Sequence, residues 1–109
     1  MRLIDIFEKC NHLKTHEQRC IGDEFIELVF YNEDLNQWYN AISAILGPPR
    51  KDKNKEPNAN DLELTSHTGG IRFEQTLFEK EFQNGTIIAK FWPWKDNIHT
   101  TMRMALLLR

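Results

Sequence analysis

The sequence lacks a long apolar run, and this absence excludes a membrane-spanning protein. No segment approaches the roughly 18 uninterrupted apolar residues that a transmembrane helix needs. Near the N-terminus, Asp5 and Glu8 interrupt the apolar residues that a signal peptide would keep continuous. We therefore expect a soluble, cytoplasmic protein that contacts no membrane.

The sequence also lacks a strong net charge of either sign. The chain has 14 Lys and Arg residues and 16 Asp and Glu residues, which gives a formal net charge of -2. A dedicated nucleic-acid binder usually carries a basic excess over the whole domain, so nucleic acid is a disfavoured partner. The basic residues of the segment 50–55 could still touch phosphate. No aromatic residue for base stacking lies among them, which favours a solvated connection instead.

No catalytic signature is present in the sequence. Ser43 and Ser66 lack the Gly-x-Ser-x-Gly frame that exposes a nucleophilic serine, and the four histidines are scattered along the chain. The two cysteines, Cys10 and Cys20, are expected to be reduced thiols in the cytoplasm. These features favour a non-enzymatic protein.

What the chain does contain is enough apolar material for one packed core. It has 109 residues, of which 40% are apolar and 11% aromatic, and this size is typical of one domain. We predict a single domain over residues 1–109. The polar segment at about 48–60 has no hydrophobic periodicity and is predicted to be a flexible loop within it.

In the first half of the chain, the apolar spacing predicts a helix, a strand and a second helix. Residues 2–18 and 33–46 repeat apolar side chains every three or four positions. Between them, residues 24–31 are rich in β-branched and aromatic residues, which favours a strand. Asn32 is a suitable N-cap for the second helix, and Gly47 is a suitable residue to end it.

The second half of the chain is predicted to be mostly β structure. Alternating residues 61–65 predict a short strand, and residues 67–70 (His-Thr-Gly-Gly) predict a tight turn. Two longer strands, 71–82 and 86–93, are joined by Asn84-Gly85, a dipeptide that favours a type I′ hairpin turn.

A turn at Asn84-Gly85 implies a register for the hairpin and therefore sorts its side chains onto two faces. One face carries mostly apolar residues and is assigned to the core: Phe78, Lys80, Phe82, Ile87, Ala89 and Phe91. The other face carries a predicted ion pair between Glu79 and Lys90, beside Leu77, Trp92 and Trp94.

The segment 98–108 fits two structures. As a strand it returns antiparallel along 86–92, with Met102 and Met104 facing one way and Arg103 the other. As a helix it would be the third of the domain. We favour the strand, which gives an α+β two-layer sandwich: helix, strand, helix, then a mostly antiparallel sheet of about five strands, with the helices on one face.

One group of residues could hold a metal ion. His12 and His16 are one helical turn apart, and Cys20 would lie a further turn along if the helix continued. These residue types bind zinc, but their spacing departs from that of structural zinc sites, and the nearby Cys10 belongs to the apolar face of the helix. A metal- or small-molecule-binding protein, possibly catalytic, with a site near His12, His16 and Cys20 is therefore the alternative function.

The leading functional hypothesis is a protein-interaction module that binds another protein or a second copy of itself, with no cofactor. Its contact surface would be the outer face or the edge of the C-terminal hairpin. Trp and Arg are enriched where proteins bind partners. The candidate partner-binding residues are Leu77, Glu79, Lys90, Trp92, Trp94 and Arg103.

Overall fold

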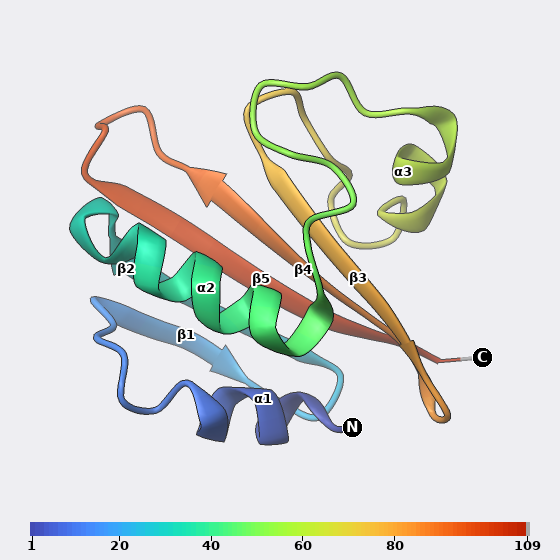
Figure 1. Cartoon of the computed structure of the whole chain (residues 1–109), viewed down its shortest axis with the longest axis horizontal. Helices are drawn as coiled ribbons and strands as arrows, with labels where there is room; N and C mark the ends of the chain where they lie inside the picture. Colours follow the sequence, from blue (N-terminus) through green and yellow to red (C-terminus); the bar gives the residue numbers. More distant parts are fainter. Residues whose placement is uncertain (109) are drawn as a thin grey trace.

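A five-stranded antiparallel sheet forms the centre of the computed structural model, which describes residues 1–108 (Figure 1). The strands are β1 (Glu17–Ile21), β2 (Phe25–Tyr31), β3 (Thr76–Phe82), β4 (Gly85–Pro93) and β5 (His99–Leu108), in the order β1-β2-β5-β4-β3. The helices are α1 (Leu3–Lys9), α2 (Leu35–Leu46) and α3 (Ala59–Leu64), with a 3-10 turn η1 (Asn32–Asp34) before α2. No helix within residues 1–108 has the length and apolar character to cross a membrane. The predicted α+β class is confirmed.

Helices α1 and α2 lie over the same face of the sheet, which we call the inner face (Figure 1). Trp38 of α2 stacks on Phe30 of β2 with ring centroids 5.4 Å apart, and its indole N–H donates to the Lys14 carbonyl at 3.1 Å. The main core fills this interface with fully buried side chains, among them Leu3, Ile6, Ile26, Leu28, Ile42, Phe78 and Ile87. The predicted placement of two helices on one face is confirmed.

The segment 98–108 forms β5 and occupies the middle of the sheet. It pairs antiparallel with β2 on one side and with β4 on the other. Met102 and Met104 are buried on the inner face, whereas Ala105 is buried on the opposite, outer face. The favoured strand is therefore confirmed, and its more apolar face is the one that packs in the main core.

The hairpin of β3 and β4 forms where it is predicted, but its register differs by two residues. Phe82 pairs with Gly85, so the turn residues are Gln83 and Asn84. Gly85 has a φ of 146°, and a Cβ there would lie 2.5 Å from the carbonyl oxygen of Leu107 on β5. The predicted residue pairs of the hairpin are therefore wrong. Gly85 belongs to the strand ladder and not to the turn, because a residue without a side chain is needed where β5 approaches this closely. Since side chains alternate with a period of two, each one nevertheless keeps its predicted face.

The helix predicted over 2–18 is wrong in its second half. Helix α1 ends at Lys9, and residues 17–21 form the edge strand β1, which pairs antiparallel with β2. All five residues of β1 are exposed. An exposed edge strand has no alternation of apolar and polar residues by which the sequence could reveal it.

The strand predicted over 61–65 is also wrong, because these residues belong mostly to helix α3. The side chain of Asn58 accepts a hydrogen bond from the Asp61 N–H at 2.8 Å, and the Asp61 carboxylate accepts one from the Asn58 N–H at 3.0 Å. This reciprocal capping box starts the helix. The spacing of Asn58 and Asp61 was the local signal for it, and it outweighs the short alternation that follows.

Residues 47–75, which we call the strap, run from α2 to β3 and include α3 (Figure 1). Ile71 of the strap packs on Leu77, Ile88 and Ala105 of the outer face, and these four side chains form a second, smaller core. The sheet is therefore covered on both faces near β3, whereas its outer face is open toward β1 and the Pro93 end of β4.

Lys51 joins the start of the strap to its end, and its backbone pairs with Leu77 of β3. The sequence predicts a solvated loop here, but Lys51 is only 4% exposed. Its ammonium group donates to the carbonyls of Arg72, Phe73 and Gln75 at 2.7, 2.7 and 2.6 Å. These carbonyls are therefore turned toward Lys51 and away from the sheet ladder, and the strand predicted to start at residue 71 starts at Thr76.

Candidate partner-binding site

A hollow of about 700 Å³ lies on the open part of the outer face. We call it the tryptophan groove and define it by Trp92, Trp94 and five cationic side chains: Arg19, Lys53, Arg72, Lys95 and Arg103. These residues come from β1, the strap, β4 with the turn that follows it, and β5. The groove therefore exists only once these four segments have come together.

Each tryptophan of the groove has a guanidinium group against its ring. Arg103 Cζ lies 4.9 Å from the ring centroid of Trp92, and Arg19 Cζ lies 5.4 Å from that of Trp94. The Trp94 ring also contacts the ring of His99, with centroids 4.7 Å apart. Cation–π attraction thus helps to orient two indoles that remain half-buried.

One carboxylate, Glu27 of β2, orients both guanidinium groups. Its side chain is 13% exposed and accepts hydrogen bonds from Arg103 Nε at 2.6 Å and from Arg19 Nη1 at 3.5 Å. Arg19 Nε also donates to Glu17 at 3.1 Å, and this hydrogen bond raises the pKa of Arg19. Arg19 and Arg103 are therefore matched by two carboxylates and act as a framework for the tryptophans.

The other three cations of the groove are not matched in this way. Lys53, Arg72 and Lys95 are exposed, and none of them forms an ion pair within residues 1–108. Among the described residues that line the groove, Glu74 is the acidic one. Like charges gathered in a concave surface create a local potential, so the groove is basic although the whole chain is slightly acidic.

The turn after β4 holds the end of the groove at Trp94. Asp96 accepts the backbone N–H groups of Ile98 at 2.9 Å and His99 at 3.1 Å, and it contacts His99 Nδ1 at 2.6 Å. These hydrogen bonds, first that from Ile98 and then that from the His99 side chain, lower the pKa of Asp96 to about 2. The Trp94 indole N–H donates to Thr101 Oγ1 at 2.7 Å. The indole is therefore held from both the turn and β5.

The six side chains that the sequence singles out for partner binding do not all lie in the groove. Three of them line it, namely Trp92, Trp94 and Arg103, and the other three, Leu77, Glu79 and Lys90, do not. Leu77 is fully buried and Lys90 is 5% exposed, so neither can contact a partner. The strap covers them, and its position over the outer face could not be read from the hairpin alone.

The predicted ion pair between Glu79 and Lys90 is wrong. Glu79 accepts a hydrogen bond from Arg50 Nη1 of the strap at 2.6 Å. The ammonium group of Lys90 donates to the carbonyls of Thr68 and Gly70, and burial lowers the pKa of Lys90 to about 8. Both charged groups therefore hold the strap to the sheet.

The candidate zinc ligands are not brought together. The helix on which their spacing depends ends at Lys9, so His16 precedes β1 and Cys20 lies on β1. The His16 ring contacts that of His99, with centroids 4.8 Å apart. In the part of the chain that the structure describes, no group of three or more His, Cys, Asp or Glu residues is placed to hold a metal ion, and His12 belongs to no such group.

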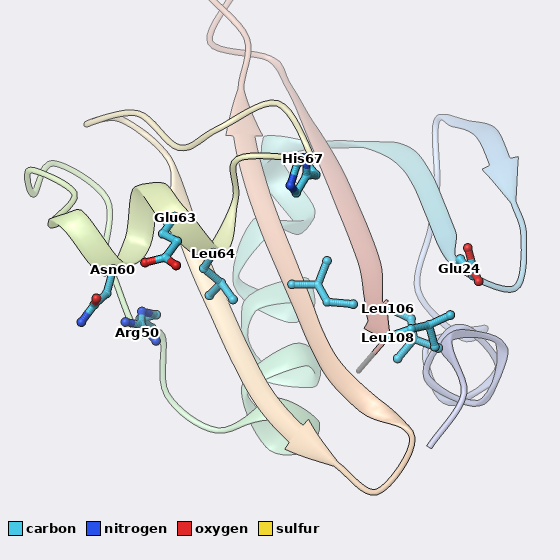
Figure 2. A pocket seen from close by; sticks show the side chains of 9 residues that line it. Glu24, Arg50, Asn60, Glu63, Leu64, His67, Leu106 and Leu108 are labelled. Atoms are coloured by element: carbon cyan, nitrogen blue, oxygen red, sulfur yellow. The ribbon is translucent and has the colours of Figure 1, made fainter.

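A second hollow of about 700 Å³ lies between α3 and the end of β5 (Figure 2). Figure 2 shows Glu63 of α3 on one side of the hollow, and Leu108 and Glu24 on the other side. The cation of this hollow, Arg50, is already bound by Asp61 at 2.6 Å. The tryptophan groove is therefore the stronger candidate for a binding site.

Sequence reasoning missed four of the five cations of the groove. Lys95 directly follows Trp94, and this adjacency could have identified it. Arg19, Lys53 and Arg72 belong to an edge strand and to the strap, and no local pattern indicates that these segments meet at the tryptophans.

The comparisons with known proteins identify no relative: no family model, no curated protein and no solved structure matches the chain. The fold and the site define an α+β domain with an aromatic, locally basic groove on the outer face of its sheet. Because a fold by itself does not specify a function, the function has to follow from the chemistry of that groove.

Proposed function

We propose that the chain is a non-enzymatic, cytoplasmic protein-interaction module that binds a partner protein in the tryptophan groove. The observation that carries the proposal is the pair Trp92 and Trp94, half-buried in a hollow of about 700 Å³ that five cationic side chains line. Trp and Arg are strongly enriched among the residues that contribute most to protein–protein affinity.

The state of the two indoles before binding supports this proposal. Trp92 is held by Arg103, and Trp94 is held by Arg19, His99 and its hydrogen bond to Thr101. Ordering a free side chain at an interface costs about 0.5–1.5 kcal/mol. Side chains that are already ordered avoid most of this cost, so the groove is suited to binding without rearrangement.

The two edges of the sheet are less suited to a partner. The edge strand β1 carries Glu17 and Arg19 on an irregular, bulged strand, and charges and bulges oppose the addition of another strand. At the other edge, Lys51 forms an antiparallel bridge with Leu77 of β3, so part of that edge is already paired. This favours the groove over strand addition.

A second copy of the chain is a poor occupant of the groove. If two grooves faced each other, Lys53, Arg72 and Lys95 of one copy would meet the same cations of the other. Like charges juxtaposed across an interface oppose association. We therefore favour a different protein as the partner over a homodimer.

Selection of random peptides displayed on phage tests the proposal without knowledge of the partner. Peptides enriched on the wild-type domain should bind the double variant Arg72→Glu/Lys95→Glu at least about tenfold more weakly, a change of about 1.4 kcal/mol. Both substituted residues are exposed, so the fold should be retained. Trp92→Ala serves as a second groove variant, with thermal unfolding as the check on its fold.

The matched control is Lys55→Glu, because Lys55 is an exposed lysine of the same strap that does not line the groove. It should leave peptide affinity within about twofold, as expected for a surface substitution away from the site. Enriched peptides that bind the groove variants as tightly as the wild type would refute the proposed function.

A further inference from the structure

We infer that the occupant of the tryptophan groove is an acidic segment of the partner protein, with one aromatic side chain that enters a small pocket beside the groove. This inference rests on the proposed function and specifies its ligand. Three features carry it: the unmatched cations, the occupied faces of the indoles, and the size and position of the pocket.

The unmatched cations determine the charge of the ligand. Lys53, Arg72 and Lys95 line the groove with Glu74 as its carboxylate, and they have no ion-pair partner within residues 1–108. Asp and Glu side chains would supply the missing negative charges. The planar guanidinium of Arg72 can bind a carboxylate through two parallel hydrogen bonds, which also fixes the orientation of the ligand.

The occupied indole faces favour a peptide over a nucleic acid. Single-stranded nucleic acids bind by stacking successive bases on aromatic faces. Trp92 has the Arg103 guanidinium over its ring, and the Trp94 ring contacts both the Arg19 guanidinium and the ring of His99. The aromatic surface available for base stacking is thereby reduced. The carboxylates of an acidic peptide, in contrast, can bind the cations without stacking on the indoles.

A small pocket adjoins the groove between α2 and the end of β4. It shares Lys53, Glu74 and Pro93 with the groove and has a volume of about 160 Å³. Its lining is mostly apolar surface, to which Tyr39 and Phe91 contribute, with Asp52, Thr76 and Thr100 as further polar residues. An apolar cavity of about 150 Å³ accommodates benzene. The pocket therefore has the volume for one phenyl-sized side chain of a ligand that continues from the groove.

The composition of the groove-dependent peptides tests the inference. Among phage-selected peptides whose affinity falls in Arg72→Glu/Lys95→Glu, we expect enrichment of Asp and Glu on both sides of one Phe, Tyr or Trp. The affinity of a fluorescein-labelled representative, measured by fluorescence anisotropy, should fall at least about tenfold when its acidic residues become Asn and Gln. It should also fall as salt is raised, because exposed charge pairs are screened.

The pocket has a test of its own. Asn36 is an exposed residue of α2 at the pocket, and Asn36→Trp should obstruct it without entering the core. Both Asn36→Trp and replacement of the peptide's aromatic residue by Ala should weaken binding at least about fivefold, and together they should cost little more than either alone, as expected for two changes at one contact. Additive losses, or losses below twofold, would overturn the role of the pocket.

The remaining outcomes separate this inference from the proposed function. Groove-dependent peptides of neutral or basic composition would overturn the acidic ligand and leave the interaction module intact. Peptides that ignore the groove variants would overturn both. A labelled dT12 oligonucleotide that binds within tenfold of the best peptide, and loses affinity in Arg72→Glu/Lys95→Glu, would assign the groove to single-stranded nucleic acid instead.

Discussion

The Arg103 guanidinium lies over the ring of Trp92 at 4.9 Å and at the same time donates from Nε to Glu27 at 2.6 Å. One side chain of the central strand β5 thus connects β2 to the wall of the groove on β4. A guanidinium suits both contacts because it is planar, permanently charged and able to donate in fixed directions. The orientation of Trp92 therefore depends on the geometry of Arg103 as well as on its charge.

Arg103→Lys should disturb Trp92 although it keeps the charge. A lysine ammonium is a compact point charge that cannot reproduce the planar contact and the directed hydrogen bond together. We expect a shifted Trp92 indole N–H resonance in NMR spectra and groove-selected peptides bound at least about fivefold more weakly, with a stability loss of only about 1 kcal/mol. Arg2→Lys, at an exposed arginine that does not line the groove, is the matched control, and an unchanged Trp92 resonance in Arg103→Lys would contradict the prediction.

Lys51→Met should destabilise the domain by about 3 kcal/mol, because three strap carbonyls lose a charged, buried hydrogen-bond donor. Lys51 is 4% exposed and donates to the carbonyls of Arg72, Phe73 and Gln75. Urea unfolding followed by tryptophan fluorescence measures the loss. Lys55→Met, at an exposed position of the same strap, should change stability by less than about 0.5 kcal/mol. Equal effects of the two substitutions would show that the carbonyl contacts do not hold the strap.

Lys90 should make the stability depend on pH in the mildly alkaline range. Burial, followed by the charge of Arg103, lowers its pKa from 10.5 in the unfolded chain to about 8 in the folded one. Between these values the unfolded state binds more protons, so the free energy of unfolding should rise with pH, by at most about 1.4 kcal/mol per pH unit from this group.

Comparison with Lys90→Met isolates this contribution, since the other ionisable groups are common to both proteins. Urea unfolding at several pH values between 8 and 9.5 should give a more positive slope of stability against pH for the wild type. Parallel curves for the two proteins would mean that Lys90 does not titrate in this range.

Gly85→Ala should destabilise the hairpin more than Gly70→Ala, although both glycines have positive φ angles of 146° and 78°. At Gly85 a methyl group would lie 2.5 Å from the Leu107 carbonyl oxygen, whereas at Gly70 nothing lies within 4 Å. We expect a loss of about 3 kcal/mol at Gly85 from strain and the steric clash, and about 1 kcal/mol at Gly70 from strain alone. Thermal unfolding of both variants measures the two stability losses. Equal losses would mean that the positive φ angle accounts for the whole effect and that the steric clash at Gly85 contributes nothing.

Features with a local signal could be predicted from the sequence. The apolar face of residues 33–46 and the glycine that follows them define α2, and the β-branched run 24–31 defines β2. The segment 98–108 fits both a strand and a helix, and the strand that we favour is the one that forms. The alternation in the hairpin sorts its side chains onto the correct faces. Each of these patterns reflects burial against one nearby surface, and such burial leaves a period of 3.6 or 2 in the sequence.

The tertiary structure decided the features that depend on segments distant in sequence. The exposed strand β1 exists because β2 pairs with it, and the register at Gly85 follows from the approach of β5. The strap buries Leu77 and Lys90 and brings Lys53 and Arg72 beside Trp92 and Trp94, which the sequence had grouped without these cations. Backbone pairing and ammonium–carbonyl hydrogen bonds carry these contacts, and because neither requires a particular apolar period, neither leaves a local pattern in the sequence.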